Sequence, residues 1–317
     1  MEIFRPGPNV WLQDLLGPGW QGFMETVSAL GSVWGILLVS GIALWLWGRR
    51  ALYAVLVVVV VEAVAKKVLA TAFYVDRPPG NEIVRYRVVE GVSSFPSGHV
   101  STATTLWAAL GFLGRMPIWV AGVVGAAVAI ARLYLGVHWL TDVVAGILLG
   151  LAMAWVGIRG FGGLADRLDR IPARAWAGVG AAAIAFAAIR VGFLMGDDPF
   201  SWNATGFLAG AGLTLPAERR FGTPPDGSLD RVAGLRRLAV GGAGIVPFFL
   251  GARAWEAPVE ILGLTAFLAT LWCFLGAPLV VARWPGAFGG PAKSPPRQRD
   301  AGGALPAGSA EPEASHG

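Results

Sequence analysis

Long apolar stretches separated by short polar loops dominate the sequence. Most of these stretches are close to the roughly 20 residues that one helical membrane crossing needs. We therefore expect an all-α fold, a polytopic membrane helical bundle. The expected spans lie near residues 27–48, 51–72, 98–114, 117–135, 139–158, 175–195, 199–215, 238–254 and 257–282.

Polar stretches and stretches rich in Gly and Pro divide the chain into five parts. A basic stretch separates the first five spans from the last four, and the residues after the last span have a composition typical of disorder. The predicted parts are an N-terminal interfacial segment at 1–26, a transmembrane core at 27–158, a cytoplasmic linker at 159–174, a C-terminal transmembrane extension of about four spans at 175–282, and a disordered tail at 283–317.

Residues 10–26 have an amphipathic pattern that predicts a helix lying on the membrane surface. Tryptophan rings favour this depth because they are apolar with one polar end. The side chains available to enter the interface are Trp11, Leu12, Leu15, Leu16 and Trp20.

Basic residues collect after every second expected span, as the positive-inside rule requires. They place the C-terminus in the cytoplasm and the loop at 73–97 on the outer face of the cell membrane. Only 14% of the residues are charged and 55% are hydrophobic, whereas soluble domains have about 25% charged residues. The net charge of +5 comes from Arg residues in these loops, so topology explains it and we expect no nucleic-acid partner.

Three polar motifs lie on the outer side of this predicted topology. They are Asp76-Arg77-Pro78-Pro79, Ser94-Phe95-Pro96-Ser97-Gly98-His99 and Arg132-x5-His138-x3-Asp142. Arg77 and Arg132 carry planar forks of donors that suit phosphate oxygens. Ser97, Gly98 and His99 open a helix, where free backbone N–H groups and the helix dipole favour an anion. The motifs therefore predict a phosphate-binding site.

Two histidines provide the chemistry that this phosphate site needs. His138 and Asp142 are four residues apart at the head of a helix, so they share one face. The carboxylate can fix the imidazole tautomer and leave the other nitrogen free to attack phosphorus. His99 is then available to protonate the leaving oxygen. This set is complete for phosphoryl transfer, and we expect no metal and no cofactor.

These residues resemble the signature of the type 2 phosphatidic acid phosphatase and vanadium haloperoxidase superfamily. That signature has a Lys-x6-Arg-Pro segment, a Pro-Ser-Gly-His segment and a Ser-Arg-x5-His-x3-Asp segment. The second segment is complete at 96–99, the third matches from Arg132 onward, and the resemblance covers roughly 27–158. It implies a helical-bundle core, a phosphohistidine at His138 and an acid role for His99. The phosphate-binding residues that it implies are Arg77, Ser97, Gly98 and Arg132.

The chain departs from this signature at two positions. Ala131 stands where the family has Ser, and Ala70 stands where it has Lys. We assign the phosphate-binding role of the missing lysine to Lys67, which lies about one helical turn earlier. Lys66 is spaced to pair with Glu62, so we expect a structural role for it.

We conclude from the sequence that the chain is an integral membrane lipid phosphatase. The expected substrate is a lipid phosphate monoester or pyrophosphate, such as phosphatidic acid, phosphatidylglycerol phosphate or a polyprenyl diphosphate. Two alternatives stay open: a lipid phosphotransferase, and a non-catalytic lipid transporter or lipid-binding protein on the same core. The sequence leaves the oligomeric state open.

Overall fold

Helices make up the regular structure of the residues that this computed structural model describes, which are 6–81, 83–86, 93–189, 199–218, 231–254 and 259–283. The all-α prediction is therefore confirmed. The predicted disordered tail lies almost wholly outside the described residues. In chain order the helices are α1 (Gly7–Leu16), α2 (Gln21–Ser28), α3 (Val33–Ala72), α4 (Gly98–Phe112), α5 (Trp119–Tyr134), α6 (Leu140–Arg170), α7 (Ala173–Ile189), α8 (Pro199–Glu218), α9 (Arg231–Ala254), α10 (Val259–Leu271) and α11 (Ala277–Arg283), with a π-helical segment Trp272–Gly276 joining the last two.

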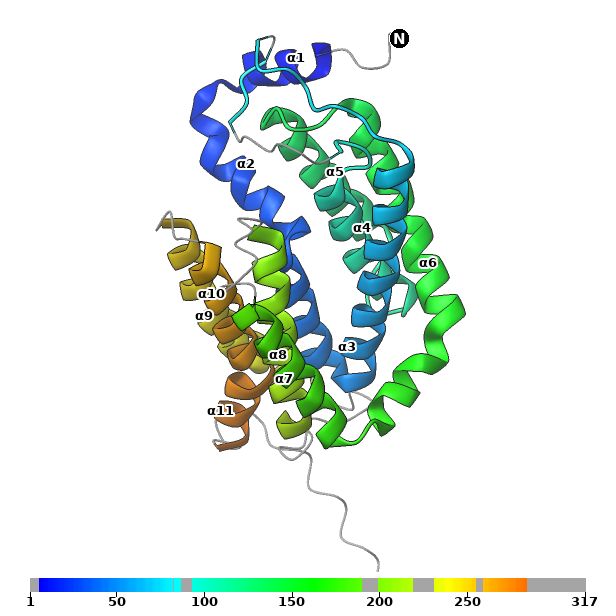
Figure 1. Ribbon diagram of the computed structural model, residues 1–317, viewed down its shortest axis with the longest axis vertical. Coiled ribbons are helices and arrows are strands. Elements are labelled where there is room, and N and C mark those ends of the chain that lie inside the picture. The colour runs from blue at the N-terminus through cyan, green and yellow to red at the C-terminus, as the bar shows by residue number, and fades with distance from the viewer. Residues whose placement is uncertain are drawn as a thin grey trace, which may run out of the picture.

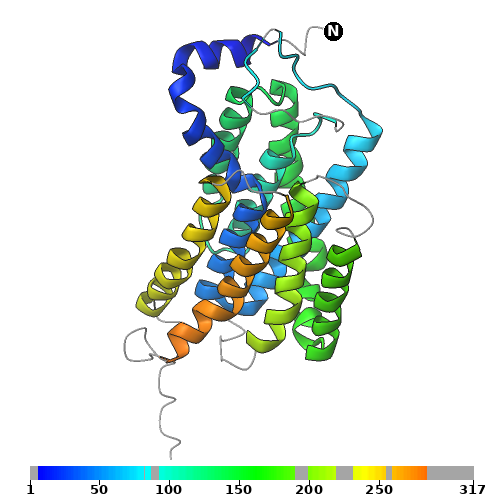
Figure 2. The ribbon, with the colours of Figure 1, turned by 60° about the vertical axis from the view of Figure 1, so that its left-hand side comes forward.

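The helix α3 consists of two arms that meet at Gly48. The backbone there has φ 81° and ψ −177°, a conformation that L side chains rarely adopt and glycine adopts readily. Figures 1 and 2 show the first arm running to the lower end of the molecule and the second arm returning from it. The turn coincides with the expected boundary between the spans at 27–48 and 51–72.

The α3 arms separate two groups of helices, as Figure 1 shows. On one side α3 packs against α4 and α6, and on the other side it contacts α9 and α10. The short helix α1 lies across one end of the bundle in both views (Figures 1 and 2). This end holds the residues of the three polar motifs.

The C-terminal helices share a core with both arms of α3. Trp45 is 2% exposed, and its Nε1 donates to the carbonyl oxygen of Cys273 at 3.1 Å. Tyr53 stacks on Trp176 of α7 with ring centroids 6.1 Å apart. The extension is therefore packed against the rest of the molecule through large buried side chains.

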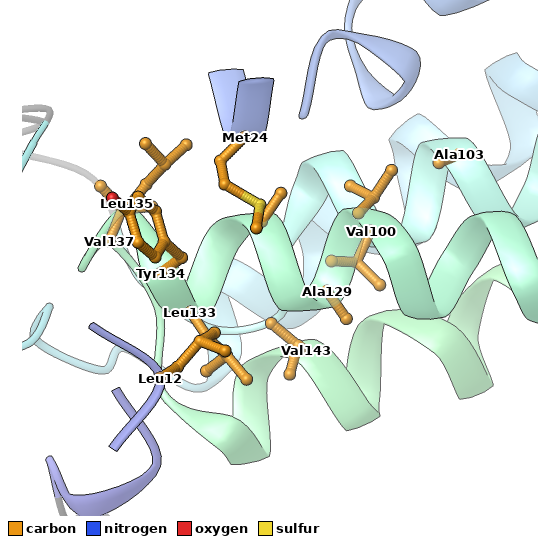
Figure 3. Close-up of a cluster of buried hydrophobic side chains, with 12 residues drawn as sticks. Leu12, Met24, Val100, Ala103, Ala129, Leu133, Tyr134, Leu135, Val137 and Val143 are labelled. Atoms are coloured by element: carbon orange, nitrogen blue, oxygen red, sulfur yellow. The ribbon is translucent and has the colours of Figure 1, made fainter. Parts of the chain in front are cut away.

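A second cluster of buried side chains surrounds the loop between α5 and α6. Leu12 of α1 and Met24 of α2 approach the end of α5 from different sides, next to Leu133 (Figure 3). Val137 and Val143, on either side of His138 in the sequence, belong to the same cluster. Five helices thus hold this loop in place.

Two predicted elements differ from the structure. The amphipathic stretch at 10–26 forms two helices, because Gly17 adopts φ 68° and a 3-10 turn at Pro18–Trp20 follows it. Within α1, Trp11 is 66% exposed, but Leu12 faces inward and is buried. The helix α6 continues to Arg170, through most of the predicted linker at 159–174. The division of the chain into domains stays a prediction.

Two helical stretches in the described ranges are long and apolar enough to cross a membrane, Leu140–Gly160 and Ile261–Val281. Exposed apolar side chains also line up at helical spacing on the second arm of α3, at Val60, Val64 and Val68. Such a stripe is unfavourable in water and suits contact with lipid. The number of spans stays a prediction.

Candidate active site

The three polar motifs meet at the end of the bundle that α1 covers. Arg77 lies in the loop after α3, Ser94 in the loop before α4, and His138 in the loop between α5 and α6. Arg77 Nη1 is 3.4 Å from His138 Nε2, and Ser94 Oγ is 3.3 Å from His138 Nδ1. Side chains from three separate loops therefore surround one imidazole.

His138 and Asp142 form a buried pair at the start of α6. His138 is 3% exposed and Asp142 is 0% exposed, with 3.5 Å between Nδ1 and Oδ2. The same Oδ2 accepts the Trp139 backbone N–H at 2.9 Å and the hydroxyl of Ser94. Because the carboxylate is fixed from several directions, it favours the tautomer with a proton on Nδ1. The lone pair of Nε2 is then on the side of Arg77.

The surroundings of His138 keep its imidazole neutral. Burial lowers the pKa of His138 below its ordinary value of 6.5, and the positive charges of Arg132 and Arg77 lower it further. The hydrogen bond with Asp142 opposes this shift and raises the pKa. A neutral imidazole at physiological pH has the lone pair that attack on phosphorus requires.

Two arginines flank the imidazole. Arg77 Nη1 donates to the Val137 carbonyl at 2.7 Å, and Nη2 donates to the Ser93 carbonyl at 3.4 Å. Arg132, in the last turn of α5, is 3% exposed and donates from Nη1 to Ser28 Oγ at 3.1 Å. Both guanidinium groups are thus oriented by neighbouring oxygens on opposite parts of the site.

The start of α4 has the features of an anion site. Gly98 is the first residue of α4, and the backbone N–H of Ser97 donates to the Asp142 carbonyl at 3.0 Å. Ser97 Oγ is buried and has no hydrogen-bond partner in the part of the chain that the structure describes. His99 is half-buried in this first turn, and its carbonyl is tightly packed against Gly31. The unpaired hydroxyl and the N-terminal N–H groups suit phosphate oxygens.

The structure places Lys66, rather than Lys67, beside this turn. The side chain of Lys67 is exposed. A Cβ at Gly98 would lie 3.2 Å from Lys66 Cδ and 3.5 Å from Lys66 Nζ, so Lys66 lies directly against Gly98. Lys66 Nζ is also 3.6 Å from Glu62 Oε1, as the sequence spacing predicted. The buried Glu62 in turn accepts hydrogen bonds from Ser101 and Thr102 of α4.

Four polar residues that support the site were not assigned a role from the sequence. Asn9 Nδ2 donates to the Leu133 and His138 carbonyls at 2.9 and 3.1 Å. Gln13 Nε2 donates to the Tyr134 carbonyl at 2.7 Å. Ser28 contacts Arg132, and Ser94 links His138 to Asp142. The available signal for the first two was a pair of amides four residues apart in a short helix.

Together, the fold and the site define a class of protein: an all-helical bundle with two oriented arginines and a buried, oriented histidine at one end. Residues 47–164 match the family model of the PAP2 superfamily. This part of the chain is similar to that family. Within the described ranges, no group of three or more His, Cys, Asp or Glu side chains is arranged to hold a metal ion.

Three curated relatives match parts of the chain. Phosphatidylglycerophosphatase B of Bacillus subtilis (strain 168) is 35% identical over 23% of this chain and 41% of its own length. A putative undecaprenyl-diphosphatase of Escherichia coli (strain K12) is 31% identical over 35% and 59%, respectively. An undecaprenyl-diphosphatase of Sulfolobus acidocaldarius is 36% identical over 21% and 32%. The chain thus spans between about a third and three fifths of the length of these relatives.

One solved structure also aligns with the chain. It is a transmembrane PAP2 type phosphatidylglycerolphosphate phosphatase from Bacillus subtilis. The alignment covers 49% of this chain and 83% of that one, with 25% identity and a TM-score of 0.41.

Proposed function

We propose that the protein is an integral membrane lipid phosphatase that works through a phosphohistidine at His138. The observation that carries this proposal is the buried imidazole with Nδ1 toward Asp142 and Nε2 toward Arg77. One ring nitrogen has an orienting carboxylate, and the other faces a group that binds phosphate oxygens. A histidine with only a packing role would not need both.

The proposed reaction has two steps. The phosphoryl oxygens bind Arg77, Arg132, Ser97 Oγ and the first N–H groups of α4, including that of Gly98. The Nε2 of His138 attacks phosphorus, and the bond to the leaving oxygen breaks as His99 donates a proton to that oxygen. Water then attacks the phosphohistidine and gives its proton to His99, which releases phosphate and restores His138.

We assign the cation of the cradle to Lys66 instead of Lys67. The support is the contact between Lys66 and Gly98, together with the exposure of Lys67. Because α4 begins at Gly98, an ammonium group there would add a full positive charge to the dipole of the helix. The buried Glu62 holds Lys66 in this place and is proposed as a positioning residue.

The proposed substrate is a phosphate monoester or pyrophosphate carried by a lipid. The names of the relatives, a phosphatidylglycerophosphatase and two undecaprenyl-diphosphatases, support a lipid phosphate. Phosphatidic acid, phosphatidylglycerol phosphate and polyprenyl diphosphates therefore form the set of candidates. The charge pattern of the loops supports an active site on the outer face and a cytoplasmic C-terminus.

A phosphate-release assay on the purified protein tests this proposal. We expect release from at least one of these three lipids, inhibition by vanadate, and a loss of more than about a thousandfold in kcat for His138→Ala. Equal release by His138→Ala and the wild-type protein would falsify the mechanism. Transfer of phosphate to an acceptor without release would support the phosphotransferase alternative, and no turnover of any donor would support the non-catalytic one.

A further inference from the structure

A cavity of about 250 Å³ opens at the end of the bundle opposite the active site. Its walls come from the second arm of α3, the turn after α4 and the C-terminal half of α6. Asp142 and the cavity residue Gly162 are twenty residues apart on α6, or about 30 Å at 1.5 Å per residue. This is the thickness of the hydrocarbon core of a bilayer, so the cavity and the active site lie at opposite membrane boundaries.

The charge around this cavity is positive. Arg50 and Arg115 line it together with one carboxylate, Asp166. Asp166 Oδ1 is 3.1 Å from Arg50 Nε, but both side chains are about half exposed, at 58% for Arg50 and 49% for Asp166. An exposed ion pair of this kind contributes little and is easily exchanged. Arg115 has no carboxylate partner among the described residues, so a second guanidinium faces the cavity.

The turn at Gly48 adds a further attraction for an anion. The second arm of α3 begins directly after Gly48, and Arg50 and Ala51 in its first turn line the cavity. The positive end of the helix dipole therefore lies at the same place as the two guanidinium groups. The left-handed backbone at Gly48, with φ 81°, is what directs this helix start toward the cavity.

The remaining walls are apolar. Ala54, Val57, Leu113 and Ile158 line the cavity beside the charged groups. A cradle of arginines next to an apolar wall matches a phosphate group attached to acyl chains better than a free anion. We propose that the cavity is a second phosphate-recognising site, which binds the headgroup of an anionic phospholipid from the leaflet opposite the active site.

Direct binding measurements on the delipidated, full-length protein test this proposal. Native mass spectrometry in neutral detergent would follow the binding of short-chain phosphatidylglycerol, of the matching phosphatidylcholine, and of inorganic phosphate. We expect the wild-type protein to bind phosphatidylglycerol in preference to the other two. Arg115→Gln should weaken this binding about tenfold or more, because one charged hydrogen bond is lost.

A second pair of variants tests the cavity without changing any charge. A Cβ at Gly160 or at Gly162 meets nothing within 4 Å, and of the two only Gly162 lines the cavity. Gly162→Leu should therefore reduce phosphatidylglycerol binding, whereas Gly160→Leu should not. His138→Ala should bind this lipid like the wild-type protein, which separates the outcome from that of the proposed phosphatase activity.

The proposal fails if wild-type protein, Arg115→Gln and Gly162→Leu bind phosphatidylglycerol equally. Tighter binding of inorganic phosphate than of the lipid would also overturn it, because the site would then serve a free anion. Thermal midpoints without lipid show whether each variant is folded. If Arg115→Gln does not fold, the pair at Gly160 and Gly162 still decides the question.

Discussion

At the scale of single residues, one carboxylate oxygen organises His138, the proposed nucleophile. Asp142 Oδ2 lies 3.5 Å from His138 Nδ1 and also receives the Trp139 N–H and the Ser94 hydroxyl. With these partners the carboxylate has little freedom to turn, and the imidazole is held in one tautomer. The nucleophile that we propose is therefore prepared before the substrate arrives.

The adjacent residues Lys66 and Lys67 of α3 provide a matched pair of variants. The pair tests which lysine supplies the positive charge of the proposed phosphate site. Lys66→Gln should lower kcat/KM about 10- to 100-fold, the effect of losing one hydrogen bond to a charged group. Lys67→Gln should have almost no effect, because the Lys67 side chain is exposed. Steady-state kinetics with a lipid substrate measure both. If Lys67→Gln lowered kcat/KM more than Lys66→Gln did, the phosphate-binding role would belong to Lys67.

The pH profile of kcat/KM reports the charge of His138. The attacking form is neutral, and the pKa of His138 is lowered by burial and by the positive charges of Arg132 and Arg77. Activity should therefore persist below pH 6.5 and be lost only as the pH falls through this lower pKa. Arg77→Gln removes one of these charges, so its acid limb should move up toward 6.5, besides lowering the rate.

Arg115→Gln serves as the control for this profile, because Arg115 lies at the other end of the bundle. Its acid limb should coincide with that of the wild-type protein. An acid limb at or above 6.5 in the wild-type protein, or a downward move in Arg77→Gln, contradicts the account.

The sequence predicted that His138 and Asp142 share one face of a helix. The spacing of His138 and Asp142 in one helical turn is visible without a structure, and the structure confirms their proximity. Asn9 and Gln13 were not predicted because their partners lie 71 or more residues away in the sequence. Lys66 could not be distinguished from Lys67, since the choice depends on the rotation of α3 relative to α4.

At the scale of elements, the loop between α5 and α6 carries His138, the proposed nucleophile, and α1 holds this loop. Asn9 and Gln13 of α1 satisfy the carbonyl groups of Leu133, Tyr134 and His138. Leu133 and Tyr134 are the last two residues of α5, where carbonyl groups run out of partners within the helix, and His138 lies in the loop that follows. The helix α1 is predicted to lie at the membrane interface. Its side chains also donate hydrogen bonds to carbonyl groups at the end of α5 and in the loop that carries His138.

Gly136 should be the position of this loop that is most sensitive to substitution. It has φ 70°, and a Cβ there would lie 2.4 Å from the Val84 carbonyl oxygen. Gly136→Ala should destabilise the protein by more than the ~1–2 kcal/mol that the left-handed backbone alone costs. It should also lower kcat/KM at least about tenfold, because His138 would move.

Gly114 is the matched control, with φ 68° and nothing within 4 Å of a Cβ. Gly114→Ala should cost only the backbone strain, about 1–2 kcal/mol, and leave the activity intact. Thermal midpoints and kinetics of the two variants separate strain from contact. Equal effects in both would show that the Val84 contact is unimportant.

The helix boundaries show where sequence patterns are informative. The charged pair after the first span marked the place where α3 turns at Gly48, because two charges interrupt a long apolar run. The break at Gly17 inside the stretch 10–26 was not predicted, since the apolar periodicity continues across it. The length of α6 was underestimated because a polar helix that leaves the membrane has the composition of a linker.

At the scale of the whole molecule, the C-terminal helices are joined to the segment that matches the PAP2 model through both arms of α3. Trp45 is the main contact, and it is buried between Gly241 of α9 and the Cys273 carbonyl. The C-terminal extension therefore supports the first arm of α3, and Lys66 lies on the second arm. The division of the chain into a core and an extension stays a prediction.

Two adjacent glycines of α9 test this packing. A Cβ at Gly241 would lie 2.1 Å from Trp45 Cη2, whereas a Cβ at Gly242 meets nothing within 4 Å. Gly241→Ala should destabilise the protein by about 1–3 kcal/mol. Gly242→Ala should be neutral or stabilise it by up to about 1 kcal/mol, because alanine favours a helix. Denaturation in detergent measures both, and equal midpoints would show that α9 does not pack on Trp45 in this way.

The central claim is that His138 carries the phosphoryl group during turnover. Its most direct test is a rapid quench, under alkaline conditions, of the purified protein reacting with a lipid substrate labelled on the reacting phosphate. The account predicts an acid-labile label on the peptide that contains His138, and no label in His138→Ala. A wild-type protein that turns over without labelling His138, or that is labelled at another residue, would contradict it.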